Sequence, residues 1–543
     1  MVQRSQDTAF LDSRLTKSTL AAVSRVLGVR SRSVRLALVL FCFLGRNDIS
    51  LALCARGATA RKRWADSGGI DETNADLDSE LALLLADSTA LLPILHELQL
   101  DGIISIGPNN TFCMNLVYSV QILKALPEKL HRFWRLKALL FASHTIPWEY
   151  LEPEPTDMST EFAHLQHTLF QIKYKKIYLT LDSNMKVEVI SSLLEASKFT
   201  DVEGRLSAVA CAKEIMIGLK SRYLKYYVAY KESLALRLSG DVAQAKEVLS
   251  SILPIRGGYS STRNVKTHSA RGHILIQRAL DYSQASELDK AIESLKGWEA
   301  MSLRPSPIES TVLFRKHLLM GELIRYRGGL NESLSHLQRS ERLIDVQPEL
   351  SFAPYRTDLF FNIGSTLIEL DEFSCAESQL RKELLRQAKE EDNVAPLLKI
   401  VLAESIFAQK RYAEAQLICQ EVAFQAHNSE REKLHLLILL AKIFHTRSDW
   451  GRAYKFWNVA LHKLGQFFPT YDHITMVIIE SLCDIARRQG LHSLQLEFEE
   501  RLFEFGDRME SLKGRHWIAG LNLWLDGLPR SLTSAHLYVA VAY

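Results

Sequence analysis

Seven apolar residues between positions 242 and 491 share the same surroundings in the sequence. A small residue stands nine positions before six of them, and another stands three positions after the same six. The exception is Leu491, which has Leu482 and Leu494 at these places. Small residues are needed where two helices cross closely, so the pattern predicts a series of helical hairpins in which each second helix begins at the apolar anchor. The anchors are Val242, Leu288, Leu330, Phe373, Tyr412, Trp450 and Leu491.

The stretch Leu440–Val459 shows this pattern most clearly, and it resembles a tetratricopeptide (TPR) unit. The anchors lie 38 to 46 residues apart, which is longer than the roughly 34 residues of a standard TPR unit. The whole chain has only 25 Gly and 14 Pro, and its apolar residues recur every three to four positions, as in helices. We therefore expect an all-α fold with a TPR-like α-solenoid over residues 221–505, in which the seventh hairpin acts as a cap.

Positive charge gathers at the front of the chain. Through Arg63 there are 12 Arg and Lys against 3 Asp and Glu, although the net charge of the whole chain is only +3. We expect residues 1–33 to be a basic, poorly ordered arm without packing partners. We favour a cytoplasmic protein, leave the nucleus open, and find an organelle transit segment less favoured. No apolar run reaches the roughly 18 residues of a membrane span, so no membrane span is expected.

Residues 34–145 predict three helices followed by one β-hairpin. The helices are Val34–Leu44, Ile49–Arg56 and Leu81–Leu98, and the hairpin has apolar runs on either side of Gly107–Asn110. This order resembles the winged-helix segment that follows the nucleotide-binding module in NLR-type STAND proteins, including fungal ones. In that family a His-Pro pair often follows the hairpin. The corresponding residues of this chain, Phe112–Val117, lack that pair. The glycine-rich phosphate loop of STAND proteins is absent too, so the resemblance implies the rear part of an NLR-like protein without its NTPase module and without a cofactor.

The domain boundaries follow from changes in composition. We expect a basic arm at 1–33, a winged-helix-like domain at 34–145, a Pro/Glu linker at 146–159, an irregular helical adaptor at 160–220, the repeats at 221–505, and a cap and tail at 506–543. Trp517 and Trp524 in this last part are expected to seal the final hairpin. The seven cysteines are dispersed without a CxxC pair, which indicates a reducing, intracellular compartment and argues against a zinc site.

No catalytic, cofactor-binding or metal-binding residue is predicted. The chain has no HExxH, GxSxG or GxGxxG motif and no Cys/His set with metal spacing. Carboxylates are plentiful, but on solenoid helices they are solvated by default. We therefore do not expect an enzyme.

The first helix of each hairpin carries the candidate binding residues, because stacked TPR-like units turn these helices toward the concave surface. Aromatic and arginine side chains are the types that anchor interfaces. For any single residue, packing between repeats or a solvated charge is an equal alternative. The predicted partner-binding groove comprises Tyr227, Tyr230, Arg237, Arg315, Arg325, Phe361, Phe407, His435, Lys442 and His445.

Three functions are compatible with this organisation. The favoured one is a non-catalytic interaction scaffold or adaptor, NLR-like in origin, that holds a protein or extended peptide on the concave face of its repeats. A DNA-associated regulator is the second, but the expected third helix of the winged element has no Lys or Arg to contact DNA. The third is an enzyme built on a helical scaffold, for instance an accessory protein of a biosynthetic pathway, although no catalytic motif supports it. Self-association stays open, and the sequence does not specify the partner or the pathway.

Overall fold

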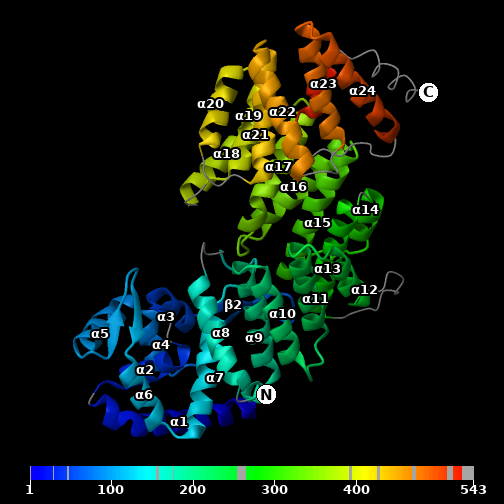
Figure 1. The fold of residues 1–543 in the computed structure, drawn as a ribbon. Helices are drawn as coiled ribbons and strands as arrows, with labels where there is room; N and C mark the ends of the chain where they lie inside the picture. Colours follow the sequence, from blue (N-terminus) through cyan, green and yellow to red (C-terminus); the bar gives the residue numbers. More distant parts are fainter. Residues whose placement is uncertain are drawn as a thin grey trace. The chain divides into compact units, whose positions relative to one another are not determined.

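The second helix of every predicted hairpin begins at its predicted anchor, or one residue after it, in the computed structural model of this chain. These helices, α12, α14, α16, α18, α20, α22 and α24, span Val242–Ile252, Leu288–Lys296, Leu330–Val346, Phe373–Glu390, Tyr412–Ala423, Trp450–Phe467 and His492–Met509. The first helices, α11, α13, α15, α17, α19, α21 and α23, span Arg222–Leu238, Val265–Gln284, Pro307–Tyr326, Ala353–Glu369, Pro396–Ala408, Glu430–Thr446 and Asp472–Arg488. The predicted all-α, TPR-like α-solenoid is therefore confirmed (Figure 1).

The structure describes residues 2–528 apart from residues 29, 46–47, 154–157, 175, 253–263, 286, 391–393, 425–428, 468–471 and 510–517. The predicted tail beyond residue 528 lies outside the described residues. The chain divides into two units. Unit 1 comprises Met1–Arg278, Ala300–Val312 and Pro348–Ser351, and unit 2 comprises Ala279–Glu299, Leu313–Gln347 and Phe352–Tyr543.

Unit 1 begins with helices and short strands. They are α1 (Val2–Leu27), α2 (Arg32–Leu44), β1 (Ile49–Ser50), α3 (Leu51–Ala58), β2 (Arg61–Trp64), β3 (Ile70–Thr73), α4 (Ser79–Ala86), α5 (Ser88–Leu100), β4 (Ile104–Ile106), β5 (Thr111–Met114), α6 (Leu116–Ala125) and α7 (Glu128–His144). Three more helices, α8 (Ser159–Tyr174), α9 (Ser183–Ala196) and α10 (Val202–Met216), lie where the helical adaptor was expected, with the 3-10 turns Ile177–Thr180 and Ser197–Phe199 beside them.

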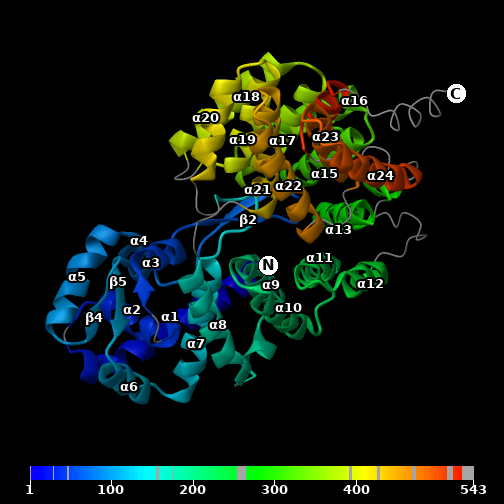
Figure 2. The ribbon, with the colours of Figure 1, turned by 45° about the horizontal axis from the view of Figure 1, so that its top comes forward.

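The predicted β-hairpin is present as strands β4 and β5. Ile104 lies opposite Met114 and Ile106 opposite Phe112, and β1 adds a third antiparallel strand along β5. The ring of Phe112 packs 5.0 Å from that of Phe41 in α2, which places the sheet beside this helix (Figure 2). A second hairpin, β2 with β3, was not predicted, because its strand residues Arg61–Trp64 read as a basic loop.

The basic front segment is a packed helix, so the prediction of a poorly ordered arm was wrong. Helix α1 contacts α2, α6 and α7. Val23 and Leu27 are fully buried, and Trp134 donates a hydrogen bond to Thr19 at 3.0 Å. Val23 and Leu27 lie four positions apart and so share one helix face. The prediction followed the arginines of this segment and did not identify its apolar face.

The expected helix Leu81–Leu98 is two helices instead of one. The carboxylate of Asp87 accepts hydrogen bonds from the backbone N–H groups of Thr89 and Ala90 and so caps the start of α5. As a result, α4 and α5 meet at an angle of 93°. Within the described residues no single helix is long and apolar enough to cross a membrane, although this bent pair passes that test of length and composition when its members are combined.

The predicted Pro/Glu linker at 146–159 is partly core, which corrects that prediction. Trp148, Tyr150 and Leu151 are each at most 4% exposed. The indole N–H of Trp148 donates to Ser192 in α9 at 3.2 Å. Prolines marked this stretch as irregular in the sequence, but its large aromatic side chains pack into unit 1, and large buried aromatics dominate core energetics.

The close helix crossings of unit 2 occur where the small residues were predicted. A Cβ atom added to Gly321 in α15 would lie 2.6 Å from the side chain of Leu337 in α16, and one added to Gly364 in α17 would lie 3.0 Å from that of Leu380 in α18. Ala441 is fully buried at the equivalent place. The first helices of neighbouring hairpins also pack against one another: α17 contacts α19, and α19 contacts α21 (Figure 1).

Candidate functional site

A segment near the C-terminus of the chain, residues 518–528, binds to the first helices of unit 2. We call it the C-terminal segment, and it contains helix α25 (Leu521–Asp526). The backbone N–H of Gly520 donates to Glu369 of α17 at 2.7 Å. Lys442 of α21 donates to the carbonyl oxygen of Gly520 at 3.4 Å. Both backbone groups of this one residue are therefore held by side chains from different hairpins.

We call the surface that holds this segment the first-helix face, because its side chains come from α17, α19, α21 and α23. Its members are Glu369, Glu404, Phe407, Lys442, His445 and Ser481.

Gly520 adopts a backbone conformation that suits glycine. Its φ is 69°, in the left-handed region where other residues are strained. A Cβ atom at this position would lie 2.6 Å from an oxygen of Glu404. The conformation and the close approach of Glu404 both exclude a larger residue here.

Lys442 and Glu404 form a buried ion pair beneath Gly520. Their side chains are 1% and 2% exposed. Burial raises the pKa of Glu404 above its ordinary value, and the neighbouring Lys442 offsets part of that effect. The ammonium group of Lys442 also lies 5.1 Å from the ring centre of Phe407, in the geometry of a cation–π contact. A buried pair of this kind is destabilised strongly if one partner is removed.

Trp524 fills an aromatic pocket one helical turn after Gly520. Its indole N–H donates to the hydroxyl of Ser481 at 2.9 Å. Its ring centre lies 5.1 Å from that of His445 and 6.2 Å from that of Phe407. Trp457 of α22, fully buried, lies 6.0 Å away. The pocket therefore binds an aromatic ring by packing and fixes its orientation by one hydrogen bond.

His445 is itself held by a carboxylate. Its Nε2 atom lies 2.9 Å from an oxygen of Asp484 in α23. Burial acts to raise the pKa of Asp484, but hydrogen bonds from His445 and Arg488 more than offset it, so this pKa lies below its ordinary value. The charged carboxylate therefore fixes the imidazole that packs against Trp524.

Three of the predicted groove residues thus lie together under the C-terminal segment: Phe407, Lys442 and His445. His435, on the same helix as the last two, is fully buried. Burial, together with the nearby charge of Lys442, lowers the pKa of His435 to about 3. It is therefore a neutral core histidine at neutral pH.

The other predicted residues of unit 2 lie elsewhere along the repeats. Arg325 is 5% exposed and donates to Asn362 at 3.3 Å. Phe361 is 1% exposed. Arg315 is half-buried, with its guanidinium 4.6 Å from the ring centre of Tyr355. Their role in partner binding stays a prediction.

Tyr227, Tyr230 and Arg237 belong to α11 in unit 1. The ammonium group of Lys231 lies 5.4 Å from the ring centre of Tyr227 and 5.7 Å from that of Tyr230. The hydroxyl of Tyr227 donates to Glu195. Burial is the main reason why the pKa of Tyr227 is raised well above its ordinary value. These tyrosines surround a lysine of their own helix, and their contact with a partner also stays a prediction.

Four residues of the site were not predicted, because the prediction rested on aromatic and cationic side chains: Glu369, Glu404, Ser481 and Gly520. A signal for Glu404 was present, since it is the one charged residue within the apolar run Ile400–Phe407. Trp524 was expected to seal the last hairpin. In the structure its segment reaches across four first helices, as far back as α17.

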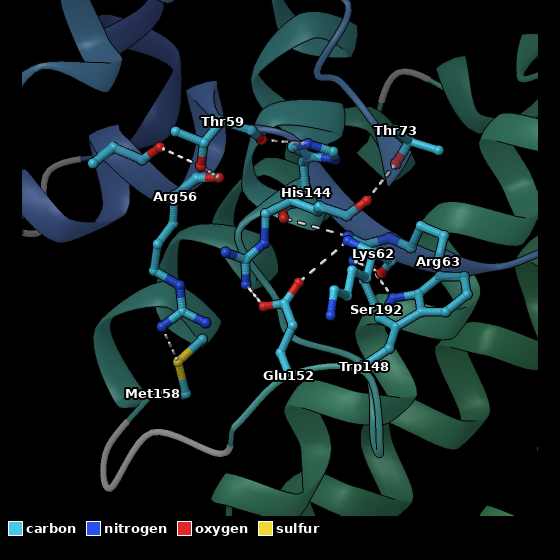
Figure 3. A network of polar contacts seen from close by, with 12 residues as sticks. Arg56, Thr59, Lys62, Arg63, Thr73, His144, Trp148, Glu152, Met158 and Ser192 are labelled. Carbon is cyan, nitrogen blue, oxygen red and sulfur yellow. Dashed lines mark hydrogen bonds and ion pairs between the residues drawn. The ribbon is translucent and has the colours of Figure 1, made fainter. Parts of the chain in front are cut away.

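Unit 1 contains another buried polar network around Arg63, and Figure 3 shows its members Arg63, His144, Trp148 and Thr59. Arg63 of β2 donates to both oxygens of Glu188, with a shortest distance of 2.7 Å, and its guanidinium lies 4.7 Å from the ring centre of Trp148. The Nε2–H group of His144 donates a hydrogen bond to the carbonyl oxygen of Thr59 at 3.1 Å. Burial and the charge of Arg63 lower the pKa of His144 to about 4. Arg63, His144 and Trp148 are buried in unit 1, whereas the side chain of Glu188 is 21% exposed.

The chain is similar to several solved structures of low sequence identity. A STAND protein with a tetratricopeptide repeat sensor from Pyrococcus horikoshii is 11% identical, over 92% of this chain and 74% of that one, with a TM-score of 0.48. A Rap protein complexed with competence and sporulation factor is 14% identical, over 66% of this chain and 99% of that one, with a TM-score of 0.42. A tetratricopeptide repeat protein from Parabacteroides merdae is 16% identical, over 54% and 97%, with a TM-score of 0.35. No family model matches the sequence, and no curated protein matches it either.

Proposed function

We propose that this protein is a non-catalytic interaction scaffold whose first-helix face in unit 2 holds a short segment of a partner protein. The observation that carries the proposal is that this face already binds a polypeptide segment. Glu369 and Lys442 hydrogen-bond to backbone groups, and Phe407 and His445 pack against a side chain. Backbone hydrogen bonds combined with a side-chain pocket are a recurring means of peptide recognition.

The charges on this face suit a peptide better than a strongly acidic or basic ligand. Lys442 is paired with Glu404, and Glu369 is the acceptor for a backbone N–H group. Burial raises the pKa of Glu369 as well. A ligand that offers backbone groups and an aromatic ring satisfies these side chains without adding charge to a buried site.

Site-directed cross-linking in cells of the native host tests the proposal. A photoreactive p-benzoylphenylalanine replaces Phe407 on the first-helix face or, as a control, Leu385 on α18, whose side chain is 63% exposed. We expect the probe at position 407 to form a cross-link to another protein, and the probe at position 385 to form none. Cross-links to the same partner from position 385 alone would overturn the assignment of the face.

We also propose an NLR-like origin for the chain. The order of α2, α3, the α4–α5 pair and the β4–β5 hairpin before the helical repeats supports it. Because the sequence has no glycine-rich phosphate loop, titration calorimetry with Mg-ATP should give no saturable heat. A saturable signal would contradict the loss of nucleotide binding that this origin assumes.

A further inference from the structure

We infer that the first-helix face recognises a defined pattern, in which a glycine is followed by an apolar residue and, four positions after the glycine, by a tryptophan. The C-terminal segment is then a built-in competitor for partner segments of the same pattern. This inference rests on the proposed function and adds the class of ligand. In this chain the pattern is Gly520, Leu521, Asn522, Leu523 and Trp524.

Three contacts hold the glycine position, and one of them, with Glu404, selects glycine. Glu369 binds the N–H of Gly520 and Lys442 binds its carbonyl. Glu404 leaves no room for a Cβ atom, which would lie 2.6 Å away. A longer side chain would have to push away a carboxylate that is itself paired with Lys442 and 2% exposed. Close packing in such an interior resists that displacement.

The position four residues after the glycine is specific for tryptophan, because of the pocket that receives its side chain. The backbone N–H of Trp524 donates to the carbonyl oxygen of Gly520 at 3.1 Å, so the first turn of α25 fixes the position of Trp524 relative to Gly520. Phe or Leu would fill part of the space between His445 and Phe407, but neither can donate to Ser481 as the indole does at 2.9 Å. Loss of the donor would leave the buried hydroxyl without that partner, which weakens binding.

The residues around these two anchors divide into buried and exposed positions. Ile518, Ala519 and Leu521 are fully buried, whereas Asn522 and Asp526 are exposed. Asn522 also donates to Glu369 at 3.4 Å, so it adds a polar contact to the face, whereas the buried positions must be apolar.

The C-terminal segment is suited to exchange with a ligand from another protein. Its helix α25 has only six residues, and a helix of that length is unstable in isolation. Its attachment depends on the anchors at Gly520 and Trp524 and on the buried residues beside them. Eight residues, 510–517, separate it from α24 in the sequence, so a partner segment must compete with a segment of the same chain.

Fluorescence anisotropy with a labelled peptide that has the sequence of residues 516–530 tests the inference. The full-length chain and its Trp524→Ala variant are compared. We expect the peptide to bind the variant about tenfold more tightly or better, because the internal competitor has lost its aromatic anchor. The full-length Gly520→Ala variant serves as a second test, in case Trp524→Ala disturbs folding, and should show the same gain.

Altered peptides test the pattern itself. A peptide in which Gly520 and Asn522 exchange places keeps the composition but loses the glycine position, and a peptide with Trp524→Ala loses the ring. Each should bind the Trp524→Ala chain about tenfold more weakly or worse than the natural sequence.

Two outcomes would overturn the inference. If the natural peptide binds the unaltered chain and both variants equally, the segment is not a competitor. If the altered peptides bind as well as the natural one, the pattern is wrong. In either case a cross-link from position 407 to another protein would still support the proposed function, so the failure of one is distinguishable from the failure of the other.

Discussion

Two buried polar networks of this protein, one in each unit, differ in what surrounds the charge. In unit 1, Arg63 and Glu188 are enclosed by core helices and strands, and the side chain of Glu188 keeps 21% of its exposure. In unit 2, Lys442 and Glu404 are 1% and 2% exposed. Part of their cover is a short separate segment, since the carbonyl of Gly520 accepts from Lys442.

This difference separates a structural network from a binding site. A charge enclosed by core elements is buried for as long as its unit is folded. A charge covered by a six-residue helix is buried only while that helix stays bound, and its environment changes when the helix leaves. Four measurements test this contrast, and they follow in order of the effect expected.

Removal of Lys442 should have the largest effect on stability. The Lys442→Met variant leaves Glu404 buried without its partner, which costs about 3–5 kcal/mol. The double variant Lys442→Met/Glu404→Leu should recover most of that loss, because an apolar pair of similar size replaces the charges. Hydrogen exchange of the backbone amides in α19 and α21 measures the stability of the single and of the double variant. A double variant as unstable as the single one would show that the unpaired charge is not the cause.

Removal of Arg63 should cost less, about 2–3 kcal/mol, the range for hydrogen bonds to charged groups. The reason is that Glu188 retains access to water when Arg63→Met removes its partner, whereas Glu404 does not. Hydrogen exchange of α9, which carries Glu188, reports the loss. A larger loss of stability for Arg63→Met than for Lys442→Met would mean that the exposure of the unpaired carboxylate does not determine how much stability is lost.

Glycines at close helix crossings allow the two units to be compared at sites that contain no charge. A Cβ atom on Gly57 in unit 1 would lie 2.4 Å from the ring of Phe141, and one on Gly321 in unit 2 would lie 2.6 Å from Leu337. Each substitution to Ala should cost about 1–3 kcal/mol through overpacking. The control is Gly465→Ala in α22, where nothing lies within 4 Å, and it should stabilise by roughly 0.5–1 kcal/mol. Thermal melts measure all three, and a loss at Gly465 would contradict the packing argument.

The smallest effect concerns two buried histidines. Burial lowers the pKa of His144 in unit 1 to about 4 and of His435 in unit 2 to about 3. The unfolded chain therefore binds more protons than the folded one below about pH 6.5, so the stabilising contribution is complete above that pH and is lost as the pH falls. Between pH 7 and pH 6 each histidine should account for less than about 1 kcal/mol.

The variants His144→Gln and His435→Gln should each flatten the pH dependence of unfolding, measured in denaturant between pH 7 and pH 5. The two should flatten it equally in this range, because it lies above both folded-state pKa values. An unequal change would contradict this expectation and would show that one histidine takes up its proton by local opening of its unit.

The hairpins were predictable because their signal is local. A close crossing requires a small residue at a fixed distance from the start of the second helix, so Gly321, Gly364 and Ala441 could be placed from spacing alone. The β4–β5 hairpin was predictable from its turn residues for the same reason. Phe407, Lys442 and His445 were found because they stand on first helices, whose face follows from the repeat.

The burial of charge was decided only by the tertiary structure. Lys442, Glu404 and His435 have the spacing of ordinary polar residues along a helix, and their environment depends on which neighbour covers them. For Lys442 that neighbour includes Gly520, which lies 78 residues away in the sequence. The same holds for α1. Its arginines predicted a solvated arm, but in the structure its apolar face packs against α2, α6 and α7. Spacing along one helix fixes which face a residue occupies, but what covers that face depends on parts of the chain that the local pattern does not contain.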